Sequence, residues 1–228
     1  MTMPINRHLL GLEPYVPGEQ PVGPGWIKLN TNENPHPPAP EVSEVFRSFV
    51  PDRARLYPPP ESPALRLAIA ETLDWPADGI IITNGSDEAL RLVAHSYLNT
   101  GDAVGMLWPT YSYYPLLAAM FGATAKLCQV GRSGQWPAEF DLDGVRVFFL
   151  ANPNPPYGTS YAAHVVEKLV TSHSNVLFVI DEAYVQFSDG DCLSLLRRCE
   201  NVFIVRTFSK SHALAGLRVG FVMARPEQ

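Results

Sequence analysis

The sequence predicts an α/β protein with three layers, in which a mostly parallel central sheet lies between two layers of helices. From residue 79 onward, short apolar segments rich in β-branched residues alternate with longer amphipathic segments. This alternation is the pattern of parallel strands joined by helices. Polar or glycine-rich clusters follow directly after several of the apolar segments. Ligands of such sheets bind beyond the carboxyl ends of the strands, so these clusters predict a single site.

The N-terminal part of the chain has a different character. Residues 1–40 are rich in Pro and Gly, include one strand-like stretch at 26–29, and predict an arm that precedes one domain over 41–228. Residues 41–50 place apolar side chains at helical spacing before Pro51, so they predict a helix. A second helix is expected to begin at Ser62-Pro63, with Ser62 as its cap and Pro63 in its first turn.

The alternating part of the chain defines the sheet and its covering helices. Strands are expected over 79–83, 103–107, 123–130, 146–150, 176–181, 202–206 and 219–223. The main helices between them are expected over 86–98, 111–121 and 161–173.

Composition excludes several classes of function. The 228 residues are 46% hydrophobic and 18% charged, which suits a globular protein with one good-sized core. A net charge of -6 without a basic tract argues against a nucleic-acid partner. The apolar runs are too short to span a bilayer and no signal peptide is evident, so a cytoplasmic location is expected. Cys128, Cys192 and Cys199 lack metal-ligand spacing, so no metal site is expected and the thiols are expected to be reduced.

The most informative segment runs from Thr207 to Arg218. Lys210 follows a buried strand, and a partly desolvated amine is easier to deprotonate and can attack a carbonyl. The hydroxyls of Thr207 and Ser209 and the guanidinium of Arg218 suit a phosphate. An amine nucleophile beside a phosphate site is what pyridoxal 5'-phosphate requires, because that cofactor offers an aldehyde and a phosphate.

A second cluster lies at Gly85-Ser86-Asp87, between a predicted strand and a predicted helix. A glycine before a helix start presents free backbone N–H groups that can bind a phosphate. The alternative is an ordinary helix start with acidic residues in its first turn.

A third cluster begins at Asp181, directly after five apolar residues. A buried carboxylate needs a partner, and the pyridinium nitrogen of the cofactor would be one. A helix cap or a structural ion pair is the alternative. Tyr184 could hydrogen-bond the phenolic oxygen of the cofactor, or it could simply pack in the core.

Two further segments follow predicted strands. Tyr111 comes first after the turn at Pro109-Thr110, so its ring could stack on a flat heteroaromatic ring. The segment 152–159 is rich in Pro and Asn, and it predicts a rigid loop that either contributes to the site or serves only as a turn.

Taken in order, these segments resemble a known family. The resembling segments are Leu29–Pro35, Tyr57-Pro58, Asn84–Glu88, Pro109–Tyr111, Asn152–Asn154, Asp181–Tyr184 and Arg206–Arg218. The chain is similar to the fold-type I pyridoxal-phosphate aminotransferases, and more narrowly to the histidinol-phosphate aminotransferase group. The resemblance implies the large domain of that fold.

The resemblance also implies roles for individual residues. Lys210, Asp181 and Tyr184 would be the catalytic group: Lys210 would bind the cofactor aldehyde and move the proton, Asp181 would pair with the ring nitrogen, and Tyr184 would bind the ring oxygen. The remaining cofactor ligands would be Gly85, Ser86, Asp87, Tyr111, Asn154, Thr207, Ser209 and Arg218, with Tyr57 from the partner subunit of a homodimer. Pro155 stands where the family usually has a second Asn, so either Asn154 would substitute for it or Tyr184 would bind the ring oxygen alone.

The implied reaction transfers an amino group from L-histidinol phosphate to 2-oxoglutarate, in histidine biosynthesis. A threonine-phosphate decarboxylase-like enzyme and a truncated, non-catalytic cofactor-binding module are the alternatives. Family members continue into a small C-terminal domain. The sequence given ends soon after Arg218, so we expect that domain to be absent from it.

Overall fold

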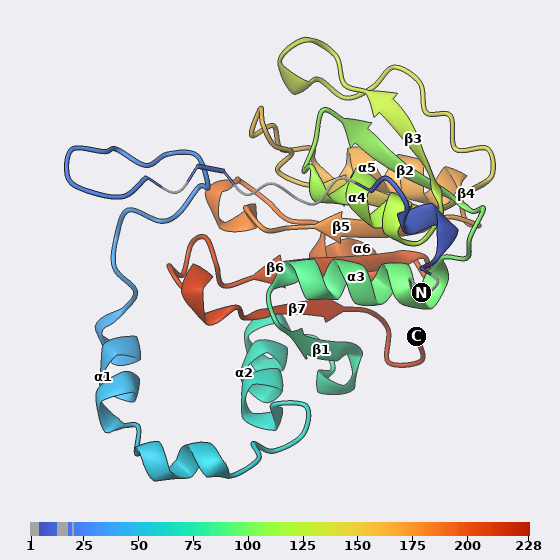
Figure 1. Cartoon of the computed structure of the whole chain (residues 1–228). Helices are drawn as coiled ribbons and strands as arrows, with labels where there is room; N and C mark the ends of the chain where they lie inside the picture. Colours follow the sequence, from blue (N-terminus) through green and yellow to red (C-terminus); the bar gives the residue numbers. More distant parts are fainter. Residues whose placement is uncertain (1–4, 13–17, 20) are drawn as a thin grey trace.

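The computed structural model describes residues 5–12, 18–19 and 21–228. Its strands are β1 Ile80–Thr83, β2 Ala103–Trp108, β3 Thr124–Gln129, β4 Val145–Ala151, β5 Leu177–Asp181, β6 Val202–Thr207 and β7 Gly220–Met223. They form one sheet in the order β1-β7-β6-β5-β4-β2-β3 (Figure 1). The neighbours from β6 through β3 pair in parallel, while β7 is antiparallel to both β1 and β6. The carboxyl ends of β1, β2, β4, β5 and β6 therefore share one edge.

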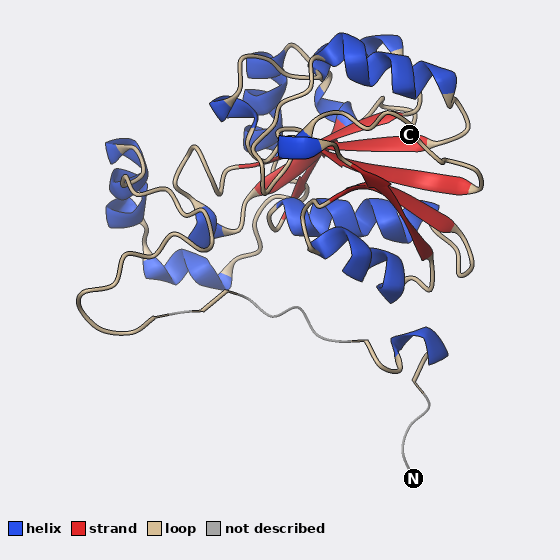
Figure 2. Cartoon of the chain, turned by 90° about the horizontal axis from the view of Figure 1, so that it is seen from above, coloured by secondary structure: helices blue, strands red, loops and turns tan. Residues whose placement is uncertain are grey.

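Helices cover both faces of this sheet (Figure 2). The α-helices are α1 Pro40–Ser48, α2 Pro63–Leu73, α3 Ser86–Tyr97, α4 Tyr113–Met120, α5 Ala163–Ser172 and α6 Leu193–Arg198. Short 3-10 helices are η1 Arg7–Leu9, η2 Pro51–Arg55, η3 Ala77–Gly79, η4 Arg132–Gly134, η5 Val185–Phe187 and η6 Ala215–Leu217. Helices α3 and α4 pack in one core, and α2, α5 and α6 pack in the other. The predicted three-layer α/β/α class with a mostly parallel sheet is confirmed.

Successive side chains along β5 and β6 point alternately into the two cores. Val179 and Val205 are buried toward α3 and α4, whereas Ile180 and Ile204 are buried toward α5 and α6. Because successive side chains of a strand point to opposite faces, Asp181 and Thr207 continue the α3–α4 series.

On the opposite face, a buried ion pair joins the ends of β5 and β6. The side chains of Arg206 and Glu182 are 8% and 0% exposed, and Arg206 Nη2 lies 2.7 Å from Glu182 Oε2. Arg206 also contacts Asp191 at 2.9 Å, and the Cys192 N–H donates to Glu182 Oε1. This cluster fixes the two strand ends that flank the site.

Most helices and strands begin and end within two residues of their predicted boundaries. Three predictions differ from the structure. Ser62 precedes α2, but it has a left-handed φ of 50° and its hydroxyl does not cap the helix, so that prediction is wrong. The stretch 26–29 is not a strand, and its apolar side chains are largely exposed because no neighbouring strand pairs with it. Helix α6 was not predicted, because six residues are too few for a helical period to be recognised.

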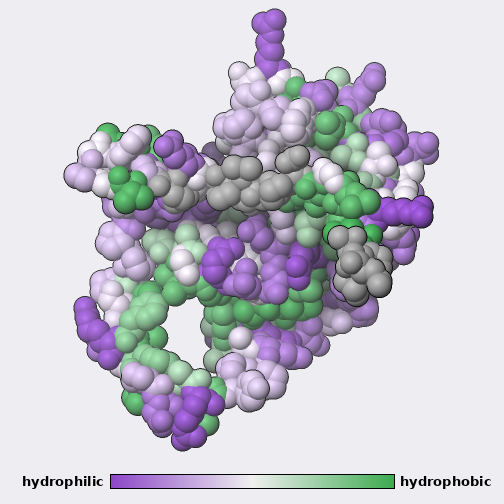
Figure 3. Space-filling model, in the orientation of Figure 1, coloured by the Kyte–Doolittle hydropathy of each residue, from purple (hydrophilic) through white to green (hydrophobic). Residues whose placement is uncertain are grey.

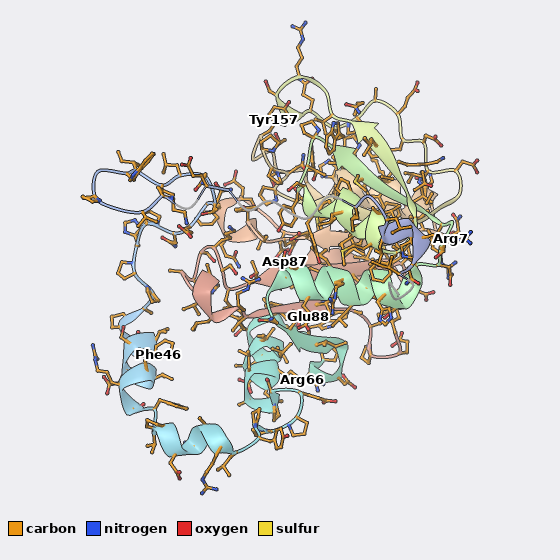
Figure 4. The ribbon with its side chains drawn as sticks, in the orientation of Figure 1. Arg7, Phe46, Arg66, Asp87, Glu88 and Tyr157 are labelled. Carbon is orange, nitrogen blue, oxygen red and sulfur yellow. The ribbon has the colours of Figure 1, made fainter. Side chains whose placement is uncertain are left out.

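The segment around α1 stands away from the sheet. Figure 3 shows an opening between this segment and the body, and apolar side chains of α1 such as Val45 and Phe46 are exposed. Figure 4 shows Phe46 on this outlying helix. The predicted division at residue 40 stays a prediction, and parts of the predicted arm (1–4, 13–17 and 20) lie outside the described residues. Within the described ranges, no helix has the length and apolar character needed to cross a membrane.

Breaking the Arg206–Glu182 pair should destabilise the fold. We expect Arg206→Met to lower the free energy of unfolding by about 3 to 5 kcal/mol, because it leaves a buried carboxylate without its partner. Chemical denaturation measures this. The control is Arg47→Met, which breaks an ion pair whose two side chains are each 71% exposed, and it should change stability by less than about 0.5 kcal/mol. Equal effects of the two substitutions would contradict the assigned role of the buried pair.

Candidate active site

The shared edge of the sheet contains a cavity of about 660 Å³, including its opening to solvent. Most of its lining side chains come from loops that follow β1, β2, β4, β5 and β6. The lining residues are Ser86, Asp87, Tyr111, Ala151, Pro153, Pro155, Asp181, Ala183, Tyr184, Thr207, Ser209, Lys210, Ala215 and Arg218. The structure thus brings together nine of the residues predicted for the site.

One end of the cavity is suited to an anion. Ser86 and Asp87 begin α3, where backbone N–H groups have no partner within the helix. Figure 4 shows Asp87 at this end of α3. Gly85 precedes them with φ +81°, and a side chain at this position would collide with the Arg218 guanidinium. A Cβ on Gly220 would lie 2.6 Å from the Ser86 nitrogen. These two glycines allow β7, Arg218 and the helix start to approach one another.

Two hydroxyl groups complete this end of the cavity. The Thr207 and Ser209 hydroxyl oxygens are 2.9 Å apart, and both residues are buried. Arg218 Nη2 lies 3.4 Å from the Asp87 carboxylate, in a partly exposed ion pair. The combination of two hydroxyls, a guanidinium and helix amides is the donor set of a phosphate site.

Asp181 lies deeper in the cavity and is almost completely buried. Burial raises the pKa of its carboxyl group from 3.8 to about 6, although hydrogen bonds from Tyr114 and the Ala183 N–H oppose the shift. Its two oxygens accept these bonds at 2.9 and 3.1 Å. The carboxylate therefore has fixed donors behind it and an ionisation state that responds to a nearby positive charge.

Lys210 also lines the cavity. Its Nζ donates to the backbone oxygens of Thr31 and Asn32 at 2.9 and 3.3 Å. The same Nζ is 5.5 Å from the centre of the Tyr184 ring. Asn32 Nδ2 in turn donates to the Tyr184 hydroxyl at 3.0 Å. The N-terminal arm is thus in direct contact with the amine.

Asn34 connects the arm to the loop that presents Lys210. Its Nδ2 donates to the backbone oxygens of Lys210 and Ser211 at 3.0 and 3.2 Å. Neither Asn32 nor Asn34 was predicted to have a role at the site, although both lie in a segment that resembles the family. Their separation from Lys210 by about 180 residues hides the contact from any local pattern.

Tyr111 lines the cavity and is held at its hydroxyl. The Tyr111 hydroxyl donates to Asp87 Oδ1 at 3.1 Å. Its ring meets that of Tyr114 edge-on, with centroids 5.6 Å apart. Tyr114 was not predicted as a site residue, because its position next to Tyr113 in an aromatic run does not distinguish it.

Asn154 and Tyr57 are not brought to the cavity. Asn154 is fully buried, but its side-chain amide donates to the Pro109 carbonyl and its Oδ1 accepts a bond from the Thr110 hydroxyl. The expected role of Asn154 as a ring-oxygen donor is therefore not supported, because the Pro-rich loop directs its amide to another turn. Tyr57 is 100% exposed and lies outside the cavity of its own chain.

Comparison with known proteins identifies the family. The sequence model of aminotransferase class I and II matches residues 24–228, so the chain belongs to this family. It is 41% identical to the histidinol-phosphate aminotransferase of Geobacter sulfurreducens, over 98% of this chain and 65% of that relative.

Solved structures agree on the fold. The histidinol-phosphate aminotransferase of Sinorhizobium meliloti, solved in complex with pyridoxal-5'-phosphate, superposes with a TM-score of 0.77 at 27% identity, over 86% of this chain and 56% of that one. L-threonine-O-3-phosphate decarboxylase of Porphyromonas gingivalis gives a TM-score of 0.72 at 23% identity, over 82% of this chain and 56% of that one, which reflects the fold alone. The chain spans about 65% of the length of the curated relative from Geobacter sulfurreducens.

The buried Asp181 should make stability depend on pH. Its pKa is about 6 in the folded protein against 3.8 as the ordinary value, so between these values the native state binds more protons than the unfolded chain. The free energy of unfolding should fall as pH rises through that window, by about 2 to 3 kcal/mol in total. The Asp181→Asn variant should not show this fall in the free energy of unfolding. The measurement compares the cofactor-free proteins by chemical denaturation between pH 4 and 7.

The exposed Asp143→Asn substitution is the matched control, and its pH dependence should follow that of the wild type. A constant stability difference between wild type and Asp181→Asn across this range would contradict the assignment.

Proposed function

We propose that the chain is the cofactor-binding part of a pyridoxal-phosphate aminotransferase that acts on L-histidinol phosphate, with 2-oxoglutarate as the amino acceptor. One observation supports this most strongly: a single cavity contains an amine, a buried carboxylate and an anion-binding end. The 41% identity to a histidinol-phosphate aminotransferase supports the choice of substrate.

The residues present fit pyridoxal phosphate. The amides of Ser86 and Asp87, the Thr207 and Ser209 hydroxyls and Arg218 would hold its phosphate, since they form the anion-binding end. The close approach that Gly85 and Gly220 permit supports this assignment. Tyr111 would lie against the ring, and Asp181 would bind the ring nitrogen.

Bound in this way, the cofactor supplies an electron sink for the pair released from the substrate Cα–H bond. Asp181 keeps the ring nitrogen protonated, because a buried carboxylate favours a cation beside it. Lys210 would supply the attachment point for the cofactor and would move the proton at the substrate Cα. Tyr184 would hold the ring oxygen from the same side as Lys210, which the 5.5 Å between Lys210 Nζ and the Tyr184 ring supports.

We also propose that the protein works as a homodimer in which Tyr57 reaches the phosphate of the neighbouring subunit. Tyr57 is fully exposed, and apolar side chains of the nearby α1 are exposed as well. A surface of this kind suits contact with further protein.

Lys210→Ala should abolish the visible absorption band that pyridoxal phosphate develops when it binds covalently to a lysine. The wild-type chain and Lys168→Ala, which changes an exposed lysine on α5, should both develop the band. A band of wild-type intensity in Lys210→Ala would refute the assignment of this lysine.

The substrate is tested with the same proteins. Wild type supplied with L-histidinol phosphate and 2-oxoglutarate should form glutamate, and Lys210→Ala should lose at least about 10³-fold in rate. Release of CO2 from L-threonine O-3-phosphate without glutamate formation would support the decarboxylase alternative instead. Cofactor binding with neither reaction would indicate a binding module.

A further inference from the structure

Tyr114 lies directly behind the candidate site, although it does not line the cavity. It is 0% exposed, and its hydroxyl donates a hydrogen bond to Asp181 Oδ2 at 2.9 Å. A buried tyrosine hydroxyl needs a partner, and a carboxylate is the strongest acceptor that a protein offers. This bond joins α4 to the end of β5.

The ring of Tyr114 has a fixed position. It stacks on Phe149 of β4 with centroids 5.3 Å apart and an interplanar angle of 19°. On another side it meets Tyr111 edge-on, at 5.6 Å and 86°. Both neighbours belong to the core on the α3–α4 face, so the hydroxyl cannot move away from Asp181 without repacking that core.

The bond also fixes the orientation of the Asp181 carboxylate. Oδ1 accepts the Ala183 N–H while Oδ2 accepts the Tyr114 hydroxyl, so donors from two elements set the plane of the carboxylate. Lys210 and Asp87 are the other charged groups that act on this carboxylate. A hydroxyl donor stabilises the ionised form, which only accepts hydrogen bonds.

We propose that Tyr114 is a positioning residue whose hydroxyl keeps the Asp181 carboxylate ionised and aimed at the ring nitrogen of the cofactor. The inference rests on the proposed function for the role of Asp181. The hydrogen bond itself does not depend on it. Tyr114 has no direct contact with the cofactor in this proposal and acts only through Asp181.

The first test uses the cofactor-free protein. Aspartate carboxyl groups labelled with ¹³C are followed by NMR against pH, and Asp181→Asn assigns the Asp181 signal. Tyr114→Phe keeps the ring and removes the hydroxyl, so it should raise the Asp181 midpoint by about one pH unit, a tenfold change. An unchanged midpoint would overturn the proposal.

Tyr161→Phe is the matched control. Tyr161 is also buried, and its hydroxyl also donates a hydrogen bond, but to the Gly134 backbone oxygen at 2.7 Å. This variant should leave the Asp181 midpoint at its wild-type value. Thermal unfolding of each variant verifies that the core around the substituted ring has formed.

The second test measures pyridoxal phosphate affinity in a double-mutant cycle. Tyr114→Phe should weaken binding about tenfold in the wild-type background and have no further effect in the Asp181→Asn background. An equal loss in both backgrounds would mean that Tyr114 acts through packing, against the proposal. If wild type itself fails to bind the cofactor, the proposed function is wrong, while the NMR midpoint still decides whether Tyr114 controls Asp181.

Discussion

The site depends on the parallel register of β5 and β6, combined with the alternation of side chains along each strand. Asp181 pairs with Val205 across the two strands, and Thr207 lies two residues farther along β6. Alternation places Asp181 and Thr207 toward α3 and α4, whereas Glu182 and Arg206 point to the opposite face. One face of the sheet edge thus bears the cavity, and the other bears the ion pair that joins the same two strand ends. A slip of one residue in register would turn the residues of the ion pair toward the cavity and the cavity residues toward the opposite face.

The electrostatics of the cavity follow from this arrangement. Burial of Asp181 disfavours its charge, while Tyr114 and the Ala183 N–H favour it, and the balance leaves the pKa at about 6. A cationic ring nitrogen would shift that balance toward the ionised form. The anion-binding end is less enclosed, since Arg218 is partly exposed and already paired with Asp87. The Asp181 carboxylate is therefore held by core packing, whereas the donor groups at the open end are held by the geometry of loops and a helix start.

Much of the fold and site was predictable because the strands are apolar, β-branched and separated by clear helices. Asp181 ends one such strand, and Ser86 and Lys210 each lie three residues beyond the end of another, so a sequence pattern can identify their positions. Tyr114, Asn32 and Asn34 were not identified in this way, because their contacts cross from one element to another and leave no local pattern. The family resemblance implied a role for Asn154, but the direction of its amide depends on Pro109 and Thr110, in a turn that is distant in sequence. The missing cap at Ser62 likewise reflects a left-handed backbone that residue identity alone does not reveal.

We propose that pyridoxal phosphate attaches to Lys210. This attachment can be mapped by incubating the chain with pyridoxal phosphate, reducing with borohydride, and analysing the peptides by mass spectrometry. We expect a phosphopyridoxyl label on the peptide that contains Lys210, and no comparable label on Lys28, Lys126 or Lys168. A label distributed among the other lysines, or confined to one of them, would show that Lys210 is not the attachment residue.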